Sequence, residues 1–575
     1  MCYKEQGELS CIVPVKRTAL TDHTSSTTRI ENGSLSSEDH QVHELRTPAL
    51  RLLPEILAII FSFHADANPT NPAGDEIVPR GMTVAQFRLA WITVTHVCSL
   101  WRQVALEYRT LWTYHRFNLG PEWTTEMLRR AGDSPLNLSF SQGIVPFLPP
   151  KVDAADIISR LLPRVSGLTI DGEACTPTVL ESLTLPAPLI SSLTISSGHF
   201  AVLPRSLFKD IAPKLRHLFL RNALPLTTVA LTRLKGLSIS IDRHMDTSDI
   251  PSYADLFNIL QAMSDLESLM LTGCLPLDPF PHYLEEQKVR FPKLRHLHLN
   301  GNVQGFRQLL EHLDFPQETI VEGTCLTDDM TGKECWDILP LLLSYLPRPS
   351  LETLDVSWGD RYDRTFHIRG YSTSHEEETS GKPCFSLKGS RCFSIGFEFK
   401  FLLWSAEQKL RILKTVYGAL PTEELHILSG NLDLGKEAWP EIFGGHQELR
   451  HIRICSLSTL HSLIPFLGRG GVYPKLVSLT LRNMDLNEKQ VGAIALIKEL
   501  KTGRPPTLSK IFIETCRISR NLVDSMRAAV PDMEIEWDDV ELPGCLQSTH
   551  GQRVIRKAPM MAPSRVGHNG FFQIN

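Results

Sequence analysis

The feature that most constrains the fold is a short apolar pattern that recurs along the chain. It has the form apolar-x-x-apolar-x-apolar, and clear copies begin at Val165, Ile190, Leu215, Leu234, Leu266, Leu294, Leu351, Leu449, Leu476 and Leu508, with a weaker copy at Leu425 and Ile427. In a β-strand, side chains alternate between two faces, so Leu218 and Leu220 share one face while Phe219 points the other way. One such strand cannot bury its apolar face alone, so the copies are expected to stack side by side.

The spacing of the copies indicates one structural unit per copy. Those that begin between residues 165 and 294 lie 19 to 32 residues apart, and the phrases PKLRHLFL from Pro213 and PKLRHLHL from Pro292 are nearly identical. The pattern and its period resemble leucine-rich repeats. The resemblance implies an α/β fold, in which an irregular leucine-rich-repeat solenoid carries a parallel sheet on its concave face. The Asn-or-Cys position of such repeats is occupied by Cys274, Asn302 and Cys516, which predicts a structural role for these side chains.

The period lapses between about residues 357 and 420. The run FSIGFEFKFLLW in this region alternates apolar and other residues, which predicts a strand or hairpin belonging to an insertion. The sequence leaves open whether the repeats on the two sides form one solenoid or two segments divided near residue 360.

A helical module is predicted before the repeats. Leu53, Ile56, Leu57 and Ile60 have helical spacing, and Pro54 stands where a helix can begin with proline. A second helical region follows, with Val97, Trp101, Val104 and Ala105 at helical spacing. Between the helices, a segment at 64–86 contains several Pro and Gly residues, so we expect a loop. The helices carry more apolar surface than so short a unit can bury, which favours docking onto another protein.

These residues resemble an F-box, and the segment WITVTHVCSLWRQVAL is similar to the expanded F-box-like families of mushroom-forming fungi. The opening Leu-Pro-x-x-Ile/Leu-Leu-x-x-Ile-Phe pattern of the family is matched from Leu53 to Phe61, the later Val-Cys-x-x-Trp-Arg pattern from Val97 to Arg102, and the closing Leu-Trp by Leu111 and Trp112. The resemblance implies binding to a Skp-type adaptor, and through it to a cullin–RING ligase. The residues implied in adaptor contact or its support are Leu53, Pro54, Ile56, Leu57, Ile60, Phe61, Val97, Cys98, Trp101 and Arg102.

The resemblance implies a substrate-recognition subunit of a ubiquitin ligase that positions a target protein and catalyses nothing itself. Residues that point out of the concave sheet would face the target: Phe219, Ser238, Met270, His298, Asp355, Arg453, Thr480 and Phe512, with Arg221, Asn300 and Arg482 beside them. An alternative is a leucine-rich-repeat scaffold whose N-terminal helices only cap the solenoid, with no ligase role. Neither reading identifies the target or shows whether a modified residue is recognised.

Composition agrees with an intracellular protein of several parts. The chain has 575 residues and a net charge of −5, without a long basic run, so neither nucleic acid nor a membrane is an expected partner. Twelve cysteines are scattered without close CxxC pairs, so we expect no metal site, and no cofactor motif is present. No signal-peptide core is recognisable, which favours the cytoplasm or the nucleus. The predicted parts are a disordered segment at 1–45, the F-box-like module at 46–118, the repeat array at 119–540 and a flexible tail at 541–575.

Overall fold

The computed structural model describes residues 52–67, 90–115, 117, 121–141, 153–225, 229–242, 245, 250–327, 338–341, 352–358, 365–371, 391–399, 406–419, 425–431, 438–443, 447–467, 473–487, 491–503 and 505–538. The segments predicted to lack regular structure, 1–45 and 541–575, lie outside the described residues, as does most of the loop predicted at 64–86.

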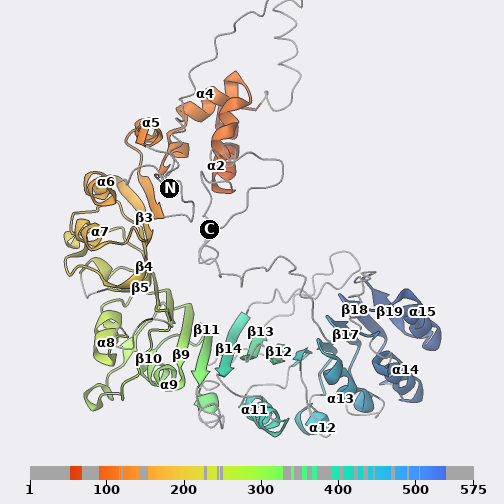
Figure 1. Ribbon diagram of the computed structural model, residues 1–575. Coiled ribbons are helices and arrows are strands. Elements are labelled where there is room, and N and C mark those ends of the chain that lie inside the picture. The colour runs from red at the N-terminus through yellow and green to blue at the C-terminus, as the bar shows by residue number, and fades with distance from the viewer. Residues whose placement is uncertain are drawn as a thin grey trace, which may run out of the picture.

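The repeats form one continuous sheet of 17 strands, which curves into an arc with the strands on its inner side (Figure 1). Neighbouring strands are parallel, except that β13 runs antiparallel to both of its neighbours. Along the arc the strands are β1 (Tyr114–His115), β2 (Leu136–Ser141), β3 (Val165–Gly172), β4 (Ser192–Val202), β5 (His217–Leu224), β6 (Gly236–Ser240), β7 (Ser268–Thr272), β9 (His296–Asn302), β11 (Ile320–Thr327), β14 (Arg391–Phe399), β13 (Thr365–Tyr371), β12 (Thr353–Trp358), β15 (Ile427–Asn431), β16 (His451–Ile454), β17 (Ser478–Arg482), β18 (Lys510–Glu514) and β19 (Glu534–Trp537). A separate small sheet pairs β8 (Val289–Arg290) with β10 (Leu313–Asp314).

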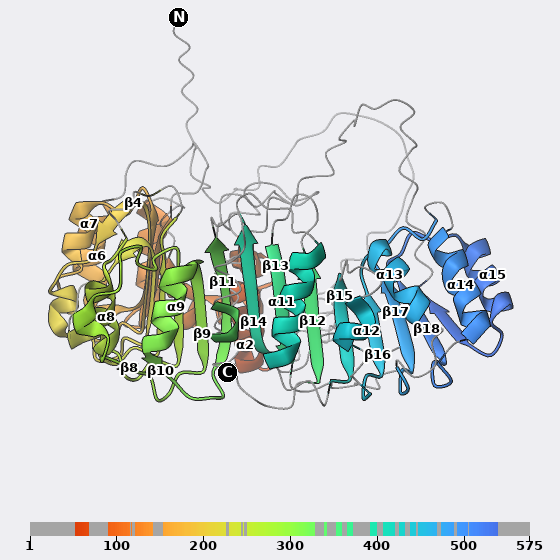
Figure 2. The same ribbon diagram turned by 90° about the horizontal axis from the view of Figure 1, so that it is seen from below.

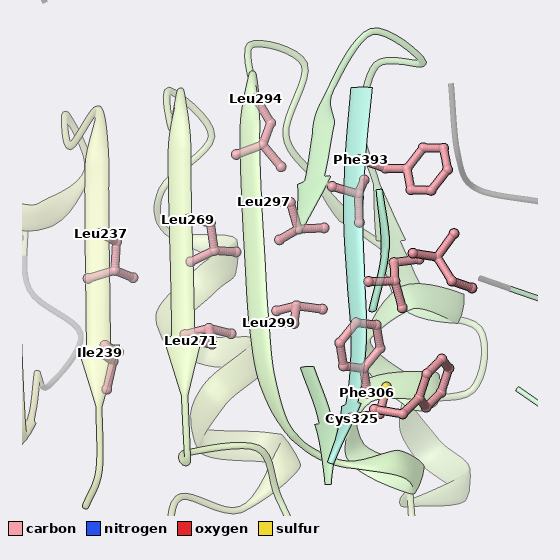
Figure 3. Packing of buried hydrophobic residues seen from close by; sticks show 14 of the residues in the cluster. Leu237, Ile239, Leu269, Leu271, Leu294, Leu297, Leu299, Phe306, Cys325 and Phe393 are labelled. Carbon is pink, nitrogen blue, oxygen red and sulfur yellow. The ribbon is translucent and has the colours of Figure 1, made fainter. Parts of the chain in front are cut away.

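The apolar residues of the repeat are aligned across the sheet and form its buried face. Register partners on successive strands include the row Leu218, Leu237, Leu269 and Leu297 and the row Leu220, Ile239, Leu271 and Leu299. All of these side chains are buried, and Figure 3 shows those of β6, β7 and β9 on one side of the sheet. Because burial of a leucine or isoleucine side chain contributes roughly 1.5–3 kcal/mol, each added repeat stabilises its neighbours. The predicted α/β leucine-rich-repeat fold is therefore confirmed.

Helices cover the outer side of the arc and pack on this buried face (Figures 1 and 2). They are α5 (Pro121–Ala131), α6 (Ala154–Leu161), α7 (Pro177–Ser182), α8 (Tyr253–Gln261), α9 (Val303–His312), α11 (Ala406–Ala419), α12 (Ala438–Phe443), α13 (Leu457–Leu467), α14 (Val491–Gly503) and α15 (Arg520–Ala529). Short 3₁₀ helices complete several connections: η4 (Leu162–Arg164), η5 (Leu207–Asp210), η6 (Val229–Leu231) and η8 (His282–Leu284). Side-chain caps begin several of the helices, such as Ser252 at α8 and Asn302 at α9.

The predicted Asn-or-Cys position has a structural role where it is filled. The thiols of Cys274 and Cys516 are buried and donate to the carbonyl oxygens of Ile239 and Leu481, at 3.6 Å and 3.3 Å. Burial raises the pKa of the Cys274 thiol to about 12, so it remains a donor at neutral pH. These bonds satisfy carbonyl groups where the chain leaves the sheet.

The predicted insertion is part of the sheet. Two strands, β14 and β13, lie between β11 and β12, because the chain returns from β12 through β13 to β14, which pairs with β11. Strand β12 also pairs with β15, which continues the parallel array. The predicted strand in FSIGFEFKFLLW is confirmed as β14, and the described repeats on the two sides belong to one sheet.

Several repeats escaped the sequence pattern because a small residue occupies an apolar position. In β11 the partner of Leu299 is Gly323, and in β15 the partner of Val356 is Gly430. The weaker copy predicted at Leu425 and Ile427 was therefore wrong at its second residue. Leu425 is buried, but the residue that aligns with the buried Ile452 is Leu428 and not Ile427. A Cβ atom at Gly430 would overlap the Val356 carbonyl oxygen, so close strand approach requires glycine here.

The predicted N-terminal helices are present as α2 (Pro54–Ala67) and α4 (Ser99–Glu107), joined by η2 (Ala90–His96) and followed by η3 (Arg109–Trp112). The predicted loop begins later than residue 64, because α2 continues to Ala67. Trp112 is fully buried: its indole nitrogen donates to the Ala105 carbonyl at 2.8 Å, and its ring contacts Trp91 with centroids 4.9 Å apart. Arg130 of α5 lies over the same ring at 4.2 Å, which joins the helical module to the first repeat.

Candidate functional site

Helix α2 and the residue before it carry apolar side chains on two adjoining faces. On one face, Leu57 and Phe61 are buried, and the Phe61 ring contacts that of Trp101 with centroids 5.1 Å apart. The other face is exposed to water and consists of Leu53, Ile56, Ile59, Ile60 and Phe63, of which Leu53 is 65% and Phe63 71% exposed. We call these five residues the α2 apolar face. The apolar arc of α2 is wider than the stripe that it buries, so the α2 apolar face lacks the cover that its composition indicates.

The start of α4 extends this exposed surface. Val97, just before the helix, is 60% exposed. Cys98 is the N-cap residue, and its sulfur accepts from the backbone N–H of Trp101 at 3.4 Å. Arg102, implied in adaptor contact or its support, donates from its Nε to the Thr95 carbonyl at 2.8 Å, which fixes η2 to α4.

The predicted adaptor-contact residues therefore have two different positions. Leu53, Pro54, Ile56, Ile60 and Val97 lie on the surface, whereas Leu57 and Phe61 lie in the core and support it. Sequence reasoning missed Ile59 and Phe63, because it assigned only one stripe to α2. The signal was present in the run of apolar residues from Ile56 to Phe63, which is wider than one buried stripe requires.

The predicted target-facing residues lie on one row that crosses the whole concave side of the sheet. Each of the following residues is the register partner of the next: Ser139, Thr169, Thr194, Phe219, Ser238, Met270, His298, Glu322, Ser394, Arg369, Asp355, Ser429, Arg453, Thr480, Phe512 and Glu536. We call it the concave row. The pattern alone predicted this alignment, because every copy has the same strand phase.

In the N-terminal half of the concave row the predicted residues are partly exposed. Phe219, Ser238, Met270 and His298 each retain accessible surface, and Nδ1 of His298 lies 3.8 Å from Oε2 of Glu322. Beside the row, Arg221 forms an ion pair with Asp242 at 3.0 Å. This half of the surface is therefore accessible to a partner.

In the C-terminal half the prediction of accessible residues was wrong, since Asp355, Arg453, Thr480 and Phe512 are buried. Asp355 accepts from Nη1 of Arg369 on β13 at 2.9 Å. Nη2 of Arg453 reaches from β16 past β17 to Oε2 of Glu514 on β18, at 3.3 Å. Cross-strand charge pairs thus engage Asp355 and Arg453, which a one-dimensional pattern does not reveal.

The histidines near the repeat strands have ordinary surroundings. Burial lowers the pKa of His217, whose ring stacks on Phe219 with centroids 6.5 Å apart. Nδ1 of His451 lies 2.7 Å from the hydroxyl oxygen of Ser478. Among the described residues, no group of three or more His, Cys, Asp or Glu side chains is arranged to hold a metal ion. In the same part of the chain, no helix is long and apolar enough to cross a membrane.

No protein-family model matches this chain, and no curated protein matches its sequence. Among solved structures, the chain is similar to a leucine-rich-repeat protein of Leptospira interrogans, with 12% identity and a TM-score of 0.26, over 72% of this chain and 86% of that chain. It is also similar to an internalin of Listeria monocytogenes, with 14% identity and a TM-score of 0.26, over 68% of this chain and 96% of that chain. The strand register, rather than these distant similarities, establishes the repeat architecture.

Proposed function

We propose that this chain is the substrate-recognition subunit of a ubiquitin ligase of the Skp–cullin–F-box type. The observation that carries the proposal is the α2 apolar face, which is exposed although it belongs to a helix that is apolar on both sides. In this proposal residues 46–118 dock onto the adaptor, residues 119–540 recognise the target, and the complex acts in the cytoplasm or the nucleus.

Adaptor docking would use the α2 apolar face together with Val97. Leu57 and Phe61 hold α2 against Trp101, and the bond from Arg102 to Thr95 holds η2 against α4, so the exposed side chains project from a packed support. Apolar anchors on a rigid support suit an interface of the usual size, about 1,600 Å² in total.

Target binding would use the concave face, and the chain would contribute position rather than chemistry. Holding a target on the sheet while α2 is fixed to the ligase raises the effective concentration of the target's lysines near the conjugating enzyme.

The test is capture of a purified Skp-type adaptor by the full chain and by the double variant Ile56→Asp, Ile60→Asp. Both side chains are exposed in the chain alone, so the variant should fold, and adaptor binding should fall at least about thirtyfold because two interface anchors are lost. The matched control is Ile494→Asp on α14, since Ile494 is 53% exposed and lies in another part of the molecule.

The alternative is a protein-binding leucine-rich-repeat scaffold in which the N-terminal helices only cap the sheet. The burial of Trp112 between Trp91 and Arg130 favours a capping role, because it seals the first repeat. Capping through Trp112 and docking through the α2 apolar face use different side chains, so they are compatible. If the chain captures no adaptor, and the Ile56, Ile60 variant behaves as wild type in every assay, the scaffold function replaces the ligase function.

A further inference from the structure

The concave side of β6 lacks bulky side chains. The β6 residues on this side are Gly236, Ser238 and Ser240, and the register partners of Ser238 are Phe219 on β5 and Met270 on β7. Neighbouring strands lie about 4.8 Å apart, so the strands that carry Phe219 and Met270 are about 10 Å apart. The small Ser238 side chain lies between these two larger ones. We call the surface formed by Phe219, Ser238, Ser240 and Met270 the β6 trough.

An ion pair marks each end of the β6 trough. Before β6, Nζ of Lys235 lies 2.8 Å from Oε1 of Glu267. At the far end, Arg221, the register partner of Ser240, lies 3.0 Å from Oδ2 of Asp242. Asp242 is fixed further by Asn222, whose Nδ2 donates to Oδ2 at 2.9 Å.

In both pairs the cation is the more exposed member. The side chain of Lys235 is 48% exposed against 30% for Glu267, and that of Arg221 is 45% exposed against 24% for Asp242. The hydrogen bond from Lys235 lowers the pKa of Glu267, so this carboxylate stays charged and turned toward its own lysine. The two ends of the trough therefore present positive charge to an approaching molecule.

We propose that the β6 trough binds an extended acidic peptide segment with an apolar side chain at its centre. The apolar side chain lies over Ser238 between Phe219 and Met270, and carboxylates on either side meet Lys235 and Arg221. This inference rests on the proposed function and specifies the chemistry of the target that the concave face holds.

The dimensions define the segment. In an extended peptide, residues i, i+2 and i+4 share one face, and i and i+4 are about 13 Å apart. From Lys235 to the level of Ser240 the strand spans about 17 Å, and the long Lys235 and Arg221 side chains cover the difference. The expected segment is therefore acidic-x-apolar-x-acidic.

The test is fluorescence anisotropy of the full chain with three labelled peptides. The first is Gly-Glu-Ser-Leu-Ser-Glu-Gly, the second has Lys in place of both Glu residues, and the third has Ser in place of Leu. The first should bind at least about tenfold more tightly than either of the others, since each of those lacks one kind of contact.

Two variants of the protein test the placement. Ser238→Phe fills the trough and should weaken binding of the first peptide at least about tenfold, whereas the matched Thr194→Phe, on the same row but on β4, should leave it unchanged. The double variant Lys235→Glu, Arg221→Glu should reverse the preference in favour of the lysine peptide. This gain of binding distinguishes recognition from loss of folding.

The proposal is overturned if no peptide binds, if acidic and basic peptides bind equally, or if Ser238→Phe and Thr194→Phe have the same effect. It is also overturned if sedimentation shows self-association that Ser238→Phe abolishes, because the occupant would then be a second copy of the chain. Adaptor capture by the wild-type chain separates the two proposals: if that chain captures the adaptor but binds no peptide, the trough is removed and the ligase function stands.

Discussion

The two halves of the concave face share one strand phase and one aligned row of residues, but they differ in what that row exposes. From β5 to β9 the row is partly open, with Phe219 and Met270 on either side of a serine. From β12 to β18 it is closed, since its residues are buried, and Asp355 and Arg453 also pair with charged side chains on other strands. The buried leucines follow the same spacing in both halves, so the repeat pattern determines the core and leaves the residues of the concave side free to vary.

This difference separates stability from recognition. A closed row ties neighbouring strands together and offers a partner little surface, whereas an open row leaves side chains free to bind. We therefore expect substitutions in the closed half to reduce stability and substitutions in the open half mainly to reduce binding. The following predictions test that division, from the largest expected effect to the smallest.

The largest effect is expected at Gly430 in the closed half. Its φ is 143°, and an added Cβ would overlap the Val356 carbonyl oxygen, so Gly430→Ala should lower the free energy of unfolding by more than about 3 kcal/mol. The matched control is Gly172→Ala in β3, which has φ of 62° but no atom within 4 Å of the added Cβ, and should cost about 1 kcal/mol. Denaturant unfolding measures both, and equal losses would contradict the packing difference.

Arg453 tests the charge network of the closed half. Arg453→Met removes the buried cation and leaves Glu514 with the more distant Arg482, whose Nε lies 3.9 Å from Oε2, so we expect a loss of about 2 kcal/mol. In the open half, Lys235→Met removes an exposed pair and should cost less than about 1 kcal/mol. Thermal unfolding of the two variants compares them directly, and a larger loss for Lys235→Met would reverse the assignment of the halves.

His115 makes the N-terminal end of the sheet sensitive to acid. Burial lowers the pKa of His115 from 6.5 to about 4, so the unfolded chain binds a proton more readily than the folded chain between these values. Stability is therefore complete above pH 6.5 and is lost as the pH falls, by roughly 2 kcal/mol at pH 5.

Hydrogen exchange at pH 7 and pH 5, corrected for the intrinsic rate, should show this loss in β1 and β2. The variant His115→Phe lacks the titrating group and should remove the difference between the two pH values. Equal acid sensitivity at β1 and at β18 in the wild-type chain would show that His115 is not the cause.

The smallest effect is expected at η5 in the N-terminal half, where Phe208, Lys209 and Asp210 all have positive φ. Lys209 is exposed, so Lys209→Gly relieves backbone strain without removing packing and should raise the free energy of unfolding by about 0.5 to 1 kcal/mol. The comparison is Lys214→Gly, outside this turn, which should give no gain in thermal stability.

Much of the fold could be predicted from the sequence, because the residues of the buried face follow a strict apolar pattern. The copies that begin at Val165 and Leu508 became β3 and β18, and the other clear copies between them became strands in the expected phase. The strands β2, β11 and β19 were missed, since their register places Pro135, Glu318 and Asp532 at the first apolar position of the pattern. The reversed order of β12, β13 and β14 could not be predicted, because strand pairing there joins residues far apart in the chain.

The candidate site was only partly predictable. The helical spacing from Leu53 to Ile60 identified α2 but not which of its two apolar faces is buried, and Ile59 and Phe63 were overlooked. The strand phase placed Phe219 and Arg453 on one row, but it could not show that one is accessible and the other is not.

By itself the sequence determined the repeat, the strand phase and the presence of excess apolar surface near the N-terminus, because these depend on local spacing and on the need to bury leucine. Only the tertiary structure decided which apolar side chains remain exposed to water and which residues of the concave face are buried. Exposure is a property of neighbours brought together from distant repeats, as Arg453 and Glu514 are, and no local pattern contains that information.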